Sequence, residues 1–152
     1  MPVPVVGTAA PDFTLNSTGG APVTLSSVTG SGTRVLLAFF PAAFSRVCTA
    51  EMCAFTEDYD AFAAAGVTVL PISVDGVPSL KEFKAKYSMN VDLLSDFKRD
   101  VSRAYGTLLE EHFVSNRAYF LIDADRIVRW AHVEDTPGTS RTSAEILAAI
   151  SA

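Results

Sequence analysis

Two uninterrupted runs of apolar residues predict the central strands of the protein. Residues 34–40 read RVLLAFF and residues 67–75 read VTVLPISVD. Turn-forming residues precede each run, Thr-Gly-Ser-Gly-Thr at 29–33 and Gly66, and an apolar run bounded in this way is typical of a strand buried on both faces of a sheet. Pro71 interrupts the second run. Because proline lacks the N–H that a strand donates to its neighbour, we expect it where pairing begins or ends.

Apolar residues at helical spacing predict several helices. The longest covers residues 46–65, in which apolar positions recur every three or four residues and acidic residues such as Glu51 lie mostly between them. Its apolar positions are Val47, Cys48, Met52, Phe55, Tyr59 and Phe62. Gly66 is expected to end this helix. The other helices are predicted over residues 78–87, 98–105 and 142–150, the last with Thr142 or Ser143 as its N-cap.

Alternating apolar and polar residues predict two hairpins. Near the N-terminus, Phe13 and Leu15 lead into the turn Asn-Ser-Thr-Gly-Gly, and Val23 and Leu25 continue as the second strand. The other hairpin has strands at 117–123 and 126–133, and a short strand is predicted at 91–94.

In chain order these elements form parallel β-α-β units followed by an antiparallel hairpin and a helix. This order predicts an α/β protein with a thioredoxin-like fold, in which helices flank a mixed central sheet and a β-hairpin extends the N-terminus. The length of 152 residues matches one domain, so we expect a single domain over residues 1–152.

The composition narrows the classes of function. The formal net charge is −5 and the pI is about 4.9, and such an acidic chain argues against nucleic acid and against an anionic membrane. The N-terminal MPVPVVG lacks the basic and apolar parts of a signal peptide. The longest apolar stretch, residues 35–44, is too short to span a bilayer. We therefore expect a cytoplasmic protein.

Both cysteines lie in PAAFSRVCTAEMCAF, residues 41–55. The strand predicted at 34–40 leads into this segment, and the predicted helix begins at or just before Cys48. Unpaired N–H groups and the positive dipole end at a helix start favour the thiolate, which is the reactive form of cysteine. Arg46 or a distant arginine would add to this effect. Ser45 lies three residues before Cys48, where its hydroxyl would either cap the helix or face the same pocket.

Cys53 follows five residues after Cys48. In an intact helix this spacing separates the two Cα atoms by about 8.5 Å, whereas a disulfide requires less than about 7 Å. A bond between them requires the first turns of the helix to unwind, which couples oxidation to local unfolding. The alternative is that Cys53 is a small core residue of the helix.

Other chemistries find little support in the sequence. Cys48, Cys53, His112 and His132 have no spacing that zinc sites use. The sequence has no C-x-x-C, G-x-S-x-G, Walker or G-x-G-x-x-G motif. We therefore expect neither a metal nor a bound cofactor, and we expect both histidines to be surface or half-buried residues.

The segment that ends at Cys48 resembles the active-site signature of the peroxiredoxins, P-x-x-x-[TS]-x-x-C, which here reads PAAFSRVC. The resemblance runs over nearly the whole chain. Its other segments, in the family's order, are GTAAPDFTL at 7–15, LLSDFKRDVSRAYG at 93–106 and NRAYFLID at 116–123. Within the family, the chain resembles the bacterioferritin-comigratory (Q-type) group and the alkyl-hydroperoxide-reductase-E-like group.

The resemblance implies a role for each residue of the site. Cys48 would be the peroxidatic cysteine, whose thiolate attacks the terminal peroxide oxygen and becomes a sulfenic acid. Arg117 would hold the thiolate and polarise the peroxide, and Glu51, in the C-T-x-E pattern, would orient that arginine. Ser45, where the family more often has threonine, would hydrogen-bond the peroxide. Pro41 would shield the site from water.

The resemblance also implies how the sulfenic acid is resolved. In the Q-type group the resolving cysteine lies on the same helix, so Cys53 would form an intramolecular disulfide with Cys48. An external reductant, such as thioredoxin or a glutaredoxin-like protein, would then reduce this disulfide. Phe40 and Phe44 would line a mouth that suits organic hydroperoxides as well as hydrogen peroxide.

Two alternatives stay open at this point. In one, Cys53 is a bystander and an external thiol resolves the Cys48 sulfenic acid directly. In the other, the chain is a redox-sensing or holdase-like protein with little turnover. The sequence is compatible with a monomer and with a homodimer.

Overall fold

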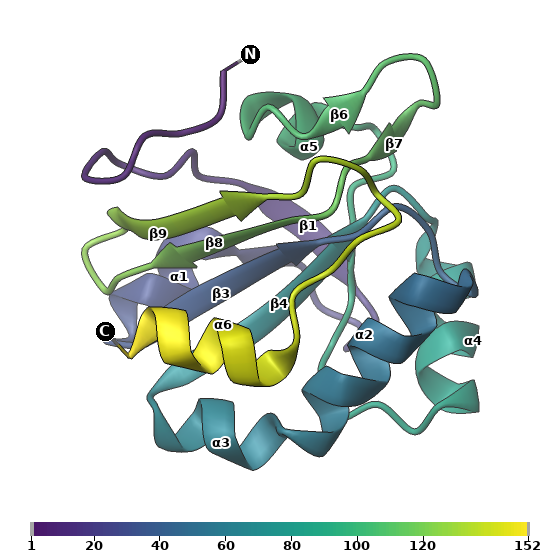
Figure 1. Ribbon diagram of the computed structural model, residues 1–152, viewed down its shortest axis with the longest axis horizontal. Coiled ribbons are helices and arrows are strands. Elements are labelled where there is room, and N and C mark those ends of the chain that lie inside the picture. The colour runs from purple at the N-terminus through teal and green to yellow at the C-terminus, as the bar shows by residue number, and fades with distance from the viewer. Residues whose placement is uncertain (1, 152) are drawn as a thin grey trace.

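A mixed β-sheet forms the centre of the protein (Figure 1). The computed structural model describes residues 2–151, and the side chain of Cys48 is outside the described part. Within this range, seven strands form the main sheet in the order β2-β1-β5-β4-β3-β8-β9. They are β1 (Thr14–Ser17), β2 (Val23–Thr24), β3 (Arg34–Phe39), β4 (Val67–Ser73), β5 (Leu94–Ser95), β8 (Ala118–Ile122) and β9 (Val128–Val133). β3 and β4 pair in parallel, and β3 and β8 pair antiparallel, so the sheet is mixed, as predicted.

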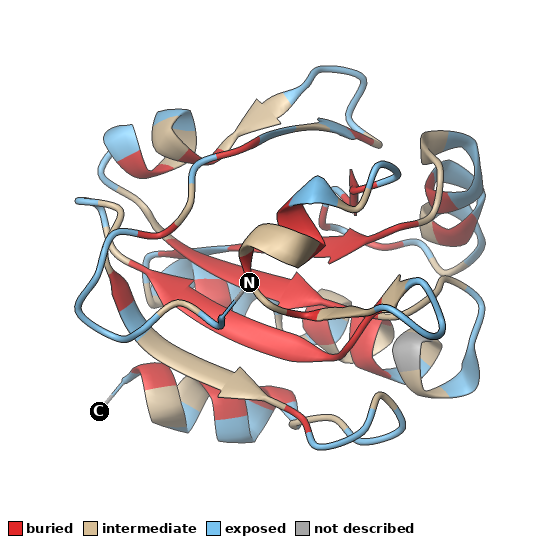
Figure 2. Ribbon diagram, turned by 90° about the horizontal axis from the view of Figure 1, so that it is seen from above, coloured by how far each residue is buried: buried red, intermediate tan, exposed pale blue. Residues whose placement is uncertain are grey.

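Helices cover both faces of this sheet. They are α1 (Leu25–Gly30), α2 (Arg46–Glu57), α3 (Tyr59–Ala64), α4 (Val77–Lys86), α5 (Asp100–Ala104) and α6 (Ser143–Ile150). Alternate residues of β3 face opposite sides. Leu36 and Ala38 pack in a core shared with α2, α3, α4 and α6, and Val35 and Leu37 pack in a second core with α1 and α5. Figure 1 shows α2, α3 and α6 below the sheet, and Figure 2 shows that the central strands are buried.

The two hairpins agree with the sequence prediction. Pro71 agrees with it on the β5 side of β4, but on the β3 side it lies within the ladder, between the pairs Leu37–Leu70 and Phe39–Ile72. β1 pairs antiparallel with β2, and β8 pairs antiparallel with β9. Pro71 lies within β4, opposite Ala38 of β3. The pairing of β4 with β5 joins Ile72 and Ser73 to Leu94 and Ser95. On that side Pro71 precedes the paired residues, so it lies where pairing begins.

The helix predicted over residues 46–65 is two helices. Asp58, with φ −98° and ψ 14°, is the C-cap of α2 and the N-cap of α3. Aspartate favours helix caps over helix interiors, and the two helices run in different directions from this point (Figure 1). Tyr59 is consequently 43% exposed and does not join the apolar face. Gly66 follows α3 with φ +72°, which confirms the predicted stop.

Two short elements differ from the prediction. Leu25 begins α1 and does not extend the second strand of the N-terminal hairpin. A separate hairpin joins β6 (Leu108–Leu109) to β7 (Val114–Ser115). Its strands have two residues each, which is too short for an alternating pattern to be recognised in the sequence.

The start of α6 confirms the predicted N-cap. The Thr142 hydroxyl accepts a hydrogen bond from the Glu145 N–H (3.1 Å), and the Glu145 carboxylate accepts one from the Thr142 N–H (3.1 Å). This reciprocal pair is a capping box. Of the helices in the described range, none has the length and apolar character needed to cross a lipid bilayer.

Candidate active site

The carboxyl end of β3 brings the predicted site residues together. Phe40 and Pro41 follow β3 directly, and α2 begins at Arg46. In the antiparallel pairing of β3 with β8, Phe39 lies opposite Ala118. This register carries Arg117, the residue before β8, to the same end of the sheet. Residues that are far apart in the sequence therefore meet where the chain passes from β3 to α2.

Both cysteines belong to α2. Cys48 falls in its first turn, as predicted, and its side chain lies outside the described residues. Cys53 is a half-buried free thiol, about two helical turns after the start of α2. α2 is continuous between the two positions, so their Cα atoms are about 8.5 Å apart. That separation exceeds the range of a disulfide.

Ser45 occupies the N-cap position of α2 with an extended backbone, φ −77° and ψ 152°. Its hydroxyl makes no capping hydrogen bond to the helix. Instead, the Ser45 Oγ donates to the carbonyl oxygen of Ala42 (2.9 Å), and the Thr49 N–H donates to the Ser45 carbonyl oxygen (2.8 Å). The side chain is exposed. Of the two functions expected for this hydroxyl, capping is therefore absent in this conformation.

Asp75 ties the segment between β3 and α2 to the end of β4. One of its carboxylate oxygens, Oδ2, accepts hydrogen bonds from the Ala43 N–H (2.8 Å) and from the Ser73 hydroxyl (2.7 Å). The Ser95 hydroxyl in turn donates to the Asp75 carbonyl oxygen (2.6 Å). Asp75 was not among the residues predicted from the sequence. Its position directly after a predicted central strand was the available signal, because carboxyl ends of parallel strands meet at one edge of the sheet.

The two phenylalanines beside Pro41 lie in different surroundings. Phe44 is 49% exposed, has φ +65°, and its ring centroid lies 5.0 Å from that of Phe83 on α4. Lys86 Nζ lies 5.9 Å from the Phe44 centroid. Phe40, in contrast, is completely buried, and its ring lies 6.4 Å from Phe83. The expectation that Phe40 lines a mouth at the surface is not met, because the alternation of β3 turns its side chain into the core.

Arg117 and Glu51 form a buried ion pair. Arg117 is 1% exposed and Glu51 is 6% exposed, and Nη1 of the arginine lies 2.7 Å from Oε1 of the glutamate. Burial raises the pKa of the Glu51 carboxyl, while the Arg117 guanidinium and the Tyr119 hydroxyl oppose that rise. The Arg117 Nε and Nη2 also donate to the Pro137 carbonyl oxygen, at 3.3 and 3.1 Å. The guanidinium is thus fixed on two sides.

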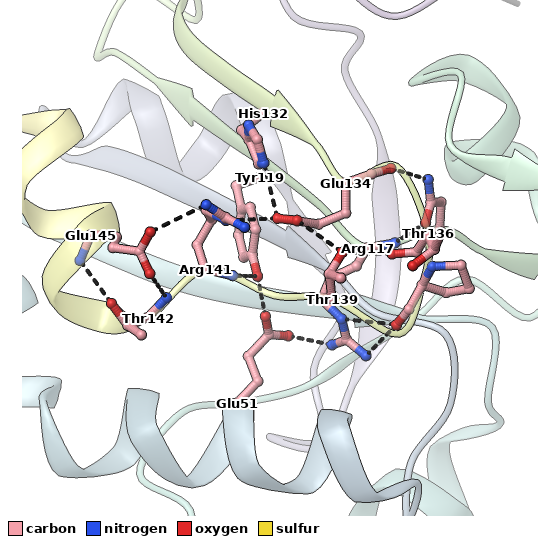
Figure 3. Close-up of polar contacts among 12 residues, drawn as sticks. Glu51, Arg117, Tyr119, His132, Glu134, Thr136, Thr139, Arg141, Thr142 and Glu145 are labelled. Atoms are coloured by element: carbon pink, nitrogen blue, oxygen red, sulfur yellow. Dashed lines mark hydrogen bonds and ion pairs between the residues drawn. The ribbon is translucent and has the colours of Figure 1, made fainter.

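Further polar residues surround this ion pair (Figure 3). The Tyr119 hydroxyl donates to Glu51 Oε2 and accepts a hydrogen bond from the Arg141 N–H (3.0 Å). Arg141 Nε donates to Oε1 of the buried Glu134 (2.7 Å), and His132 Nε2 lies 2.9 Å from the same oxygen. Tyr119 and Glu134 were not among the site residues predicted from the sequence. Tyr119 lies two residues after Arg117, so strand alternation places it on the same face.

The histidines have ordinary positions. His132 is half-buried on β9, and His112 is exposed beside the β6–β7 turn. Both placements agree with the expectation of surface or half-buried residues. His132 reaches the candidate site through Glu134 and through its ring, which stacks on that of Tyr119 at 6.4 Å; among the described contacts it has none with Arg117.

Comparisons with known proteins agree over most of the chain. Residues 6–131 match the AhpC/TSA family. The chain is 40% identical over 131 residues to peroxiredoxin 2 of Thermoplasma acidophilum, which covers 82% of this chain and 64% of that relative. It is 36% identical over 138 residues to alkyl hydroperoxide reductase E of Mycobacterium tuberculosis, which covers 90% of this chain and 89% of that relative. The chain therefore spans about two thirds of the first protein and most of the second.

A solved structure gives the same picture of the fold. The crystal structure of reduced Plasmodium vivax 2-Cys peroxiredoxin superposes with a TM-score of 0.88 at 32% sequence identity, over 96% of this chain and 80% of that one. This likeness confirms the predicted thioredoxin-like fold.

Proposed function

The chain belongs to the AhpC/TSA family, the peroxiredoxins, which are thiol-dependent peroxidases, and from this premise we propose that it reduces hydrogen peroxide and organic hydroperoxides at Cys48. The single domain of residues 1–152 would carry the whole reaction. The observation that supports this most strongly is the buried Arg117–Glu51 pair at the end of β3, one helical turn from the position of Cys48 on α2.

In the first step, the Cys48 thiolate attacks the terminal oxygen of the hydroperoxide. The O–O bond breaks, the sulfur becomes a sulfenic acid, and the leaving oxygen takes a proton and departs as water or an alcohol. Arg117 stabilises the thiolate and the negative charge that moves onto the leaving oxygen. A cation that is already fixed in place needs no reorganisation during the reaction. The start of α2 adds its positive dipole end at the same position.

Neighbouring residues shape the pocket around this step. The exposed Ser45 hydroxyl donates to Ala42 in the absence of substrate, and we assign it a hydrogen bond to the bound peroxide. Pro41 excludes water from the thiolate. Phe44, which is half exposed beside Phe83, offers an apolar contact to an organic hydroperoxide, and Phe40 supports Phe83 from within the core.

In the second step, the Cys53 thiolate attacks the sulfur of the Cys48 sulfenic acid. An S–S bond forms, the S–O bond breaks, and the hydroxide leaves as water after protonation. Both positions lie in a continuous α2, so the first turns of this helix must unwind before the sulfur atoms meet. A thioredoxin or glutaredoxin-like dithiol then reduces the disulfide in the cytoplasm, and the chain works as a monomer or homodimer.

Peptide mapping tests both steps. Stoichiometric peroxide should oxidise the wild-type protein, and digestion under non-reducing conditions should yield a Cys48–Cys53 disulfide. Cys48→Ser should abolish peroxide consumption, and retained turnover in that variant would exclude the assignment. Cys53→Ser is the matched variant: it should still reduce one equivalent of peroxide and stop at the sulfenic acid.

The alternatives give different results in the same experiment. If only sulfenic or sulfinic acid appears on Cys48 of the wild-type protein, Cys53 is a bystander and an external thiol resolves the site. Steady consumption of peroxide with thioredoxin and its reductase separates an enzyme from a redox sensor or holdase, which would react once and stop.

A further inference from the structure

Tyr119 is a completely buried tyrosine whose hydroxyl takes part in the polar contacts around Arg117 (Figure 3). It lies two residues after Arg117 on β8, so both side chains leave the same face of the sheet, toward α2. Its hydroxyl donates to Oε2 of Glu51, the carboxylate oxygen that Arg117 does not contact in the described bonds. Burial also raises the pKa of the Tyr119 hydroxyl, so the group stays protonated and remains a donor.

A glutamate carboxylate needs two contacts to have a fixed plane. The last torsion of a glutamate side chain has a broad, shallow energy profile. A bond to Oε1 alone would let the carboxylate turn about that contact. Because Tyr119 holds Oε2 while Arg117 Nη1 meets Oε1 at 2.7 Å, the carboxylate plane is set. The guanidinium that pairs with it is set as a consequence.

The hydroxyl of Tyr119 is itself held by the connection between β9 and α6. The Arg141 N–H donates to it at 3.0 Å. The same connection supplies the Pro137 carbonyl oxygen, which accepts from Nε and Nη2 of Arg117. Glu134, 4% exposed, secures this segment through Arg141 Nε (2.7 Å) and Thr139 Oγ1 (3.2 Å). One segment thus holds the arginine directly on one side and, through Tyr119 and Glu51, on the other.

We propose that Tyr119 is a positioning residue of the peroxide reaction, which sets the orientation of Arg117 through Glu51 without contacting the substrate. This inference rests on the proposed function for its kinetic consequence. Its structural core, a guanidinium held in place through the hydroxyl of Tyr119, does not depend on that function.

Tyr119→Phe tests the inference, with Tyr105→Phe as the matched control. Tyr105 is also completely buried, and its hydroxyl donates to the Pro11 carbonyl oxygen (2.7 Å) in the core on the opposite face of the sheet. Each variant loses one buried hydroxyl: Tyr119→Phe removes the bonds to Glu51 and from the Arg141 N–H, and Tyr105→Phe removes the bond to Pro11. We expect Tyr119→Phe to lower the rate constant of Cys48 oxidation by peroxide about tenfold, the size of one hydrogen bond to a charged group. Tyr105→Phe should change it less than about twofold at a similar loss of thermal stability.

A double-mutant cycle with Glu51→Ala, which removes both oxygens that Arg117 and Tyr119 contact, separates positioning from a general structural effect. If Tyr119 acts through Glu51, Tyr119→Phe should lower the rate less than about twofold further in the Glu51→Ala background. Effects that multiply fully in the double variant would overturn the proposal, because Tyr119 would then act by another route. An equal loss of rate in Tyr105→Phe would overturn it as well.

Nuclear magnetic resonance of the Arg117 Nε–H supplies a readout that needs no turnover. In the wild-type protein this proton is bonded to Pro137, and we expect its exchange with water to be about tenfold faster in Tyr119→Phe. Unchanged exchange would overturn the inference even in an active enzyme. If the wild-type protein left peroxide untouched, the proposed function would fail, and this measurement would still decide whether Tyr119 positions Arg117.

Discussion

The two sides of the candidate active site are held with very different strength. On the β8 side, Arg117 and Glu51 are buried and form an ion pair. Glu51 also accepts a hydrogen bond from Tyr119, and Arg117 donates to the Pro137 carbonyl oxygen. On the other side, residues 41–45 are half-buried or exposed. In the described part of the chain, the Ala43 N–H ties this segment to Asp75 by one hydrogen bond. Phe44 adds a ring contact to Phe83, from a left-handed backbone conformation that is uncommon outside glycine.

The proposed reaction gives this difference a purpose. Stabilising a developing charge requires a cation that is fixed before the reaction begins. Forming a disulfide between positions 48 and 53 requires the opposite property, because α2 must open at its start. A rigid β8 side and a lightly held start of α2 meet both requirements in one site. Changes on the rigid side should therefore affect the peroxide step, and changes to the hydrogen bonds that hold the start of α2 should affect the resolving step.

Arg117→Lys should have the largest effect. Lysine keeps the charge, but a single ammonium cannot reproduce the planar contacts of the guanidinium with both Glu51 and Pro137. We expect the rate constant of Cys48 oxidation to fall about 100-fold. Stopped-flow fluorescence of Trp130, the one tryptophan of the chain, would follow the reaction, since its ring lies 6.4 Å from that of Tyr119.

Arg34→Lys is the control for this change. Arg34 lies at the opposite end of β3 and also donates to backbone carbonyl oxygens, those of Ala65 and Ile150. It has no described contact with Glu51 or Tyr119. Its replacement should alter the rate less than about twofold. A comparable loss in both variants would show that the buried pair has no special role on the rigid side.

Asp75→Ala should have an intermediate effect on the other side of the site. It removes the acceptor of the Ala43 N–H and of the Ser73 hydroxyl. We expect backbone amides of residues 43–49 to exchange with deuterium about tenfold faster, because the start of α2 opens more often. The Cys48–Cys53 disulfide should then form faster after a pulse of peroxide, as measured by quenched-flow mass spectrometry.

Asp92→Ala is the matched variant for Asp75→Ala. Asp92 also accepts two hydrogen bonds, both from side chains, Thr18 Oγ1 (3.1 Å) and Lys84 Nζ (2.6 Å), but it precedes β5 at the other end of the sheet. The rate of disulfide formation should not change in this variant. If Asp75→Ala slowed the disulfide step, the start of α2 would not be the element that limits resolution.

The sequence predicted the strands and the helix that carry this site better than the tertiary hydrogen bonds that hold its side chains. The apolar runs at 34–40 and 67–75 identified β3 and β4 because strands buried on both faces leave a continuous pattern. The motif from Pro41 to Cys48 is local, so its position at the start of a helix could be inferred directly. Arg117 required the family resemblance, since its nearness depends on the register of β3 with β8. No local pattern reports such a register.

The residues that the sequence did not reveal act through tertiary contacts. Pro137 contributes a backbone carbonyl oxygen, which every residue type possesses. Asp75 and Tyr119 belong to a strand end and a strand that read as ordinary sheet residues. The helical spacing put Glu51 among the polar positions of its helix, yet it is buried, because it faces the charge of Arg117, directly before β8. The break at Asp58 shows the same limit, since an apolar repeat continues across it.

Phe44→Ala should have the smallest effect, and it tests the lightly held side for substrate contact. Phe113→Ala is a close control: Phe113 is 46% exposed with φ +57°, against 49% and +65° for Phe44, so both variants place alanine in a similar backbone conformation. Phe113 packs against Arg99, whose Cζ lies 4.3 Å from the centroid of the Phe113 ring, whereas Phe44 packs against Phe83. A loss of rate that occurs in Phe44→Ala but not in Phe113→Ala therefore comes from the place of Phe44 in the segment that follows Pro41.

We expect Phe44→Ala to lower the rate constant for an aromatic or long-chain hydroperoxide about threefold, the size of a weak apolar contact. The rate with hydrogen peroxide should remain the same, because that substrate has no apolar part to bind. An equal loss with both peroxides would mean that Phe44 supports the segment from Pro41 to Ser45 and not the substrate. The lightly held side would then serve the opening of α2 alone, and discrimination between peroxides would have to arise from another part of the site.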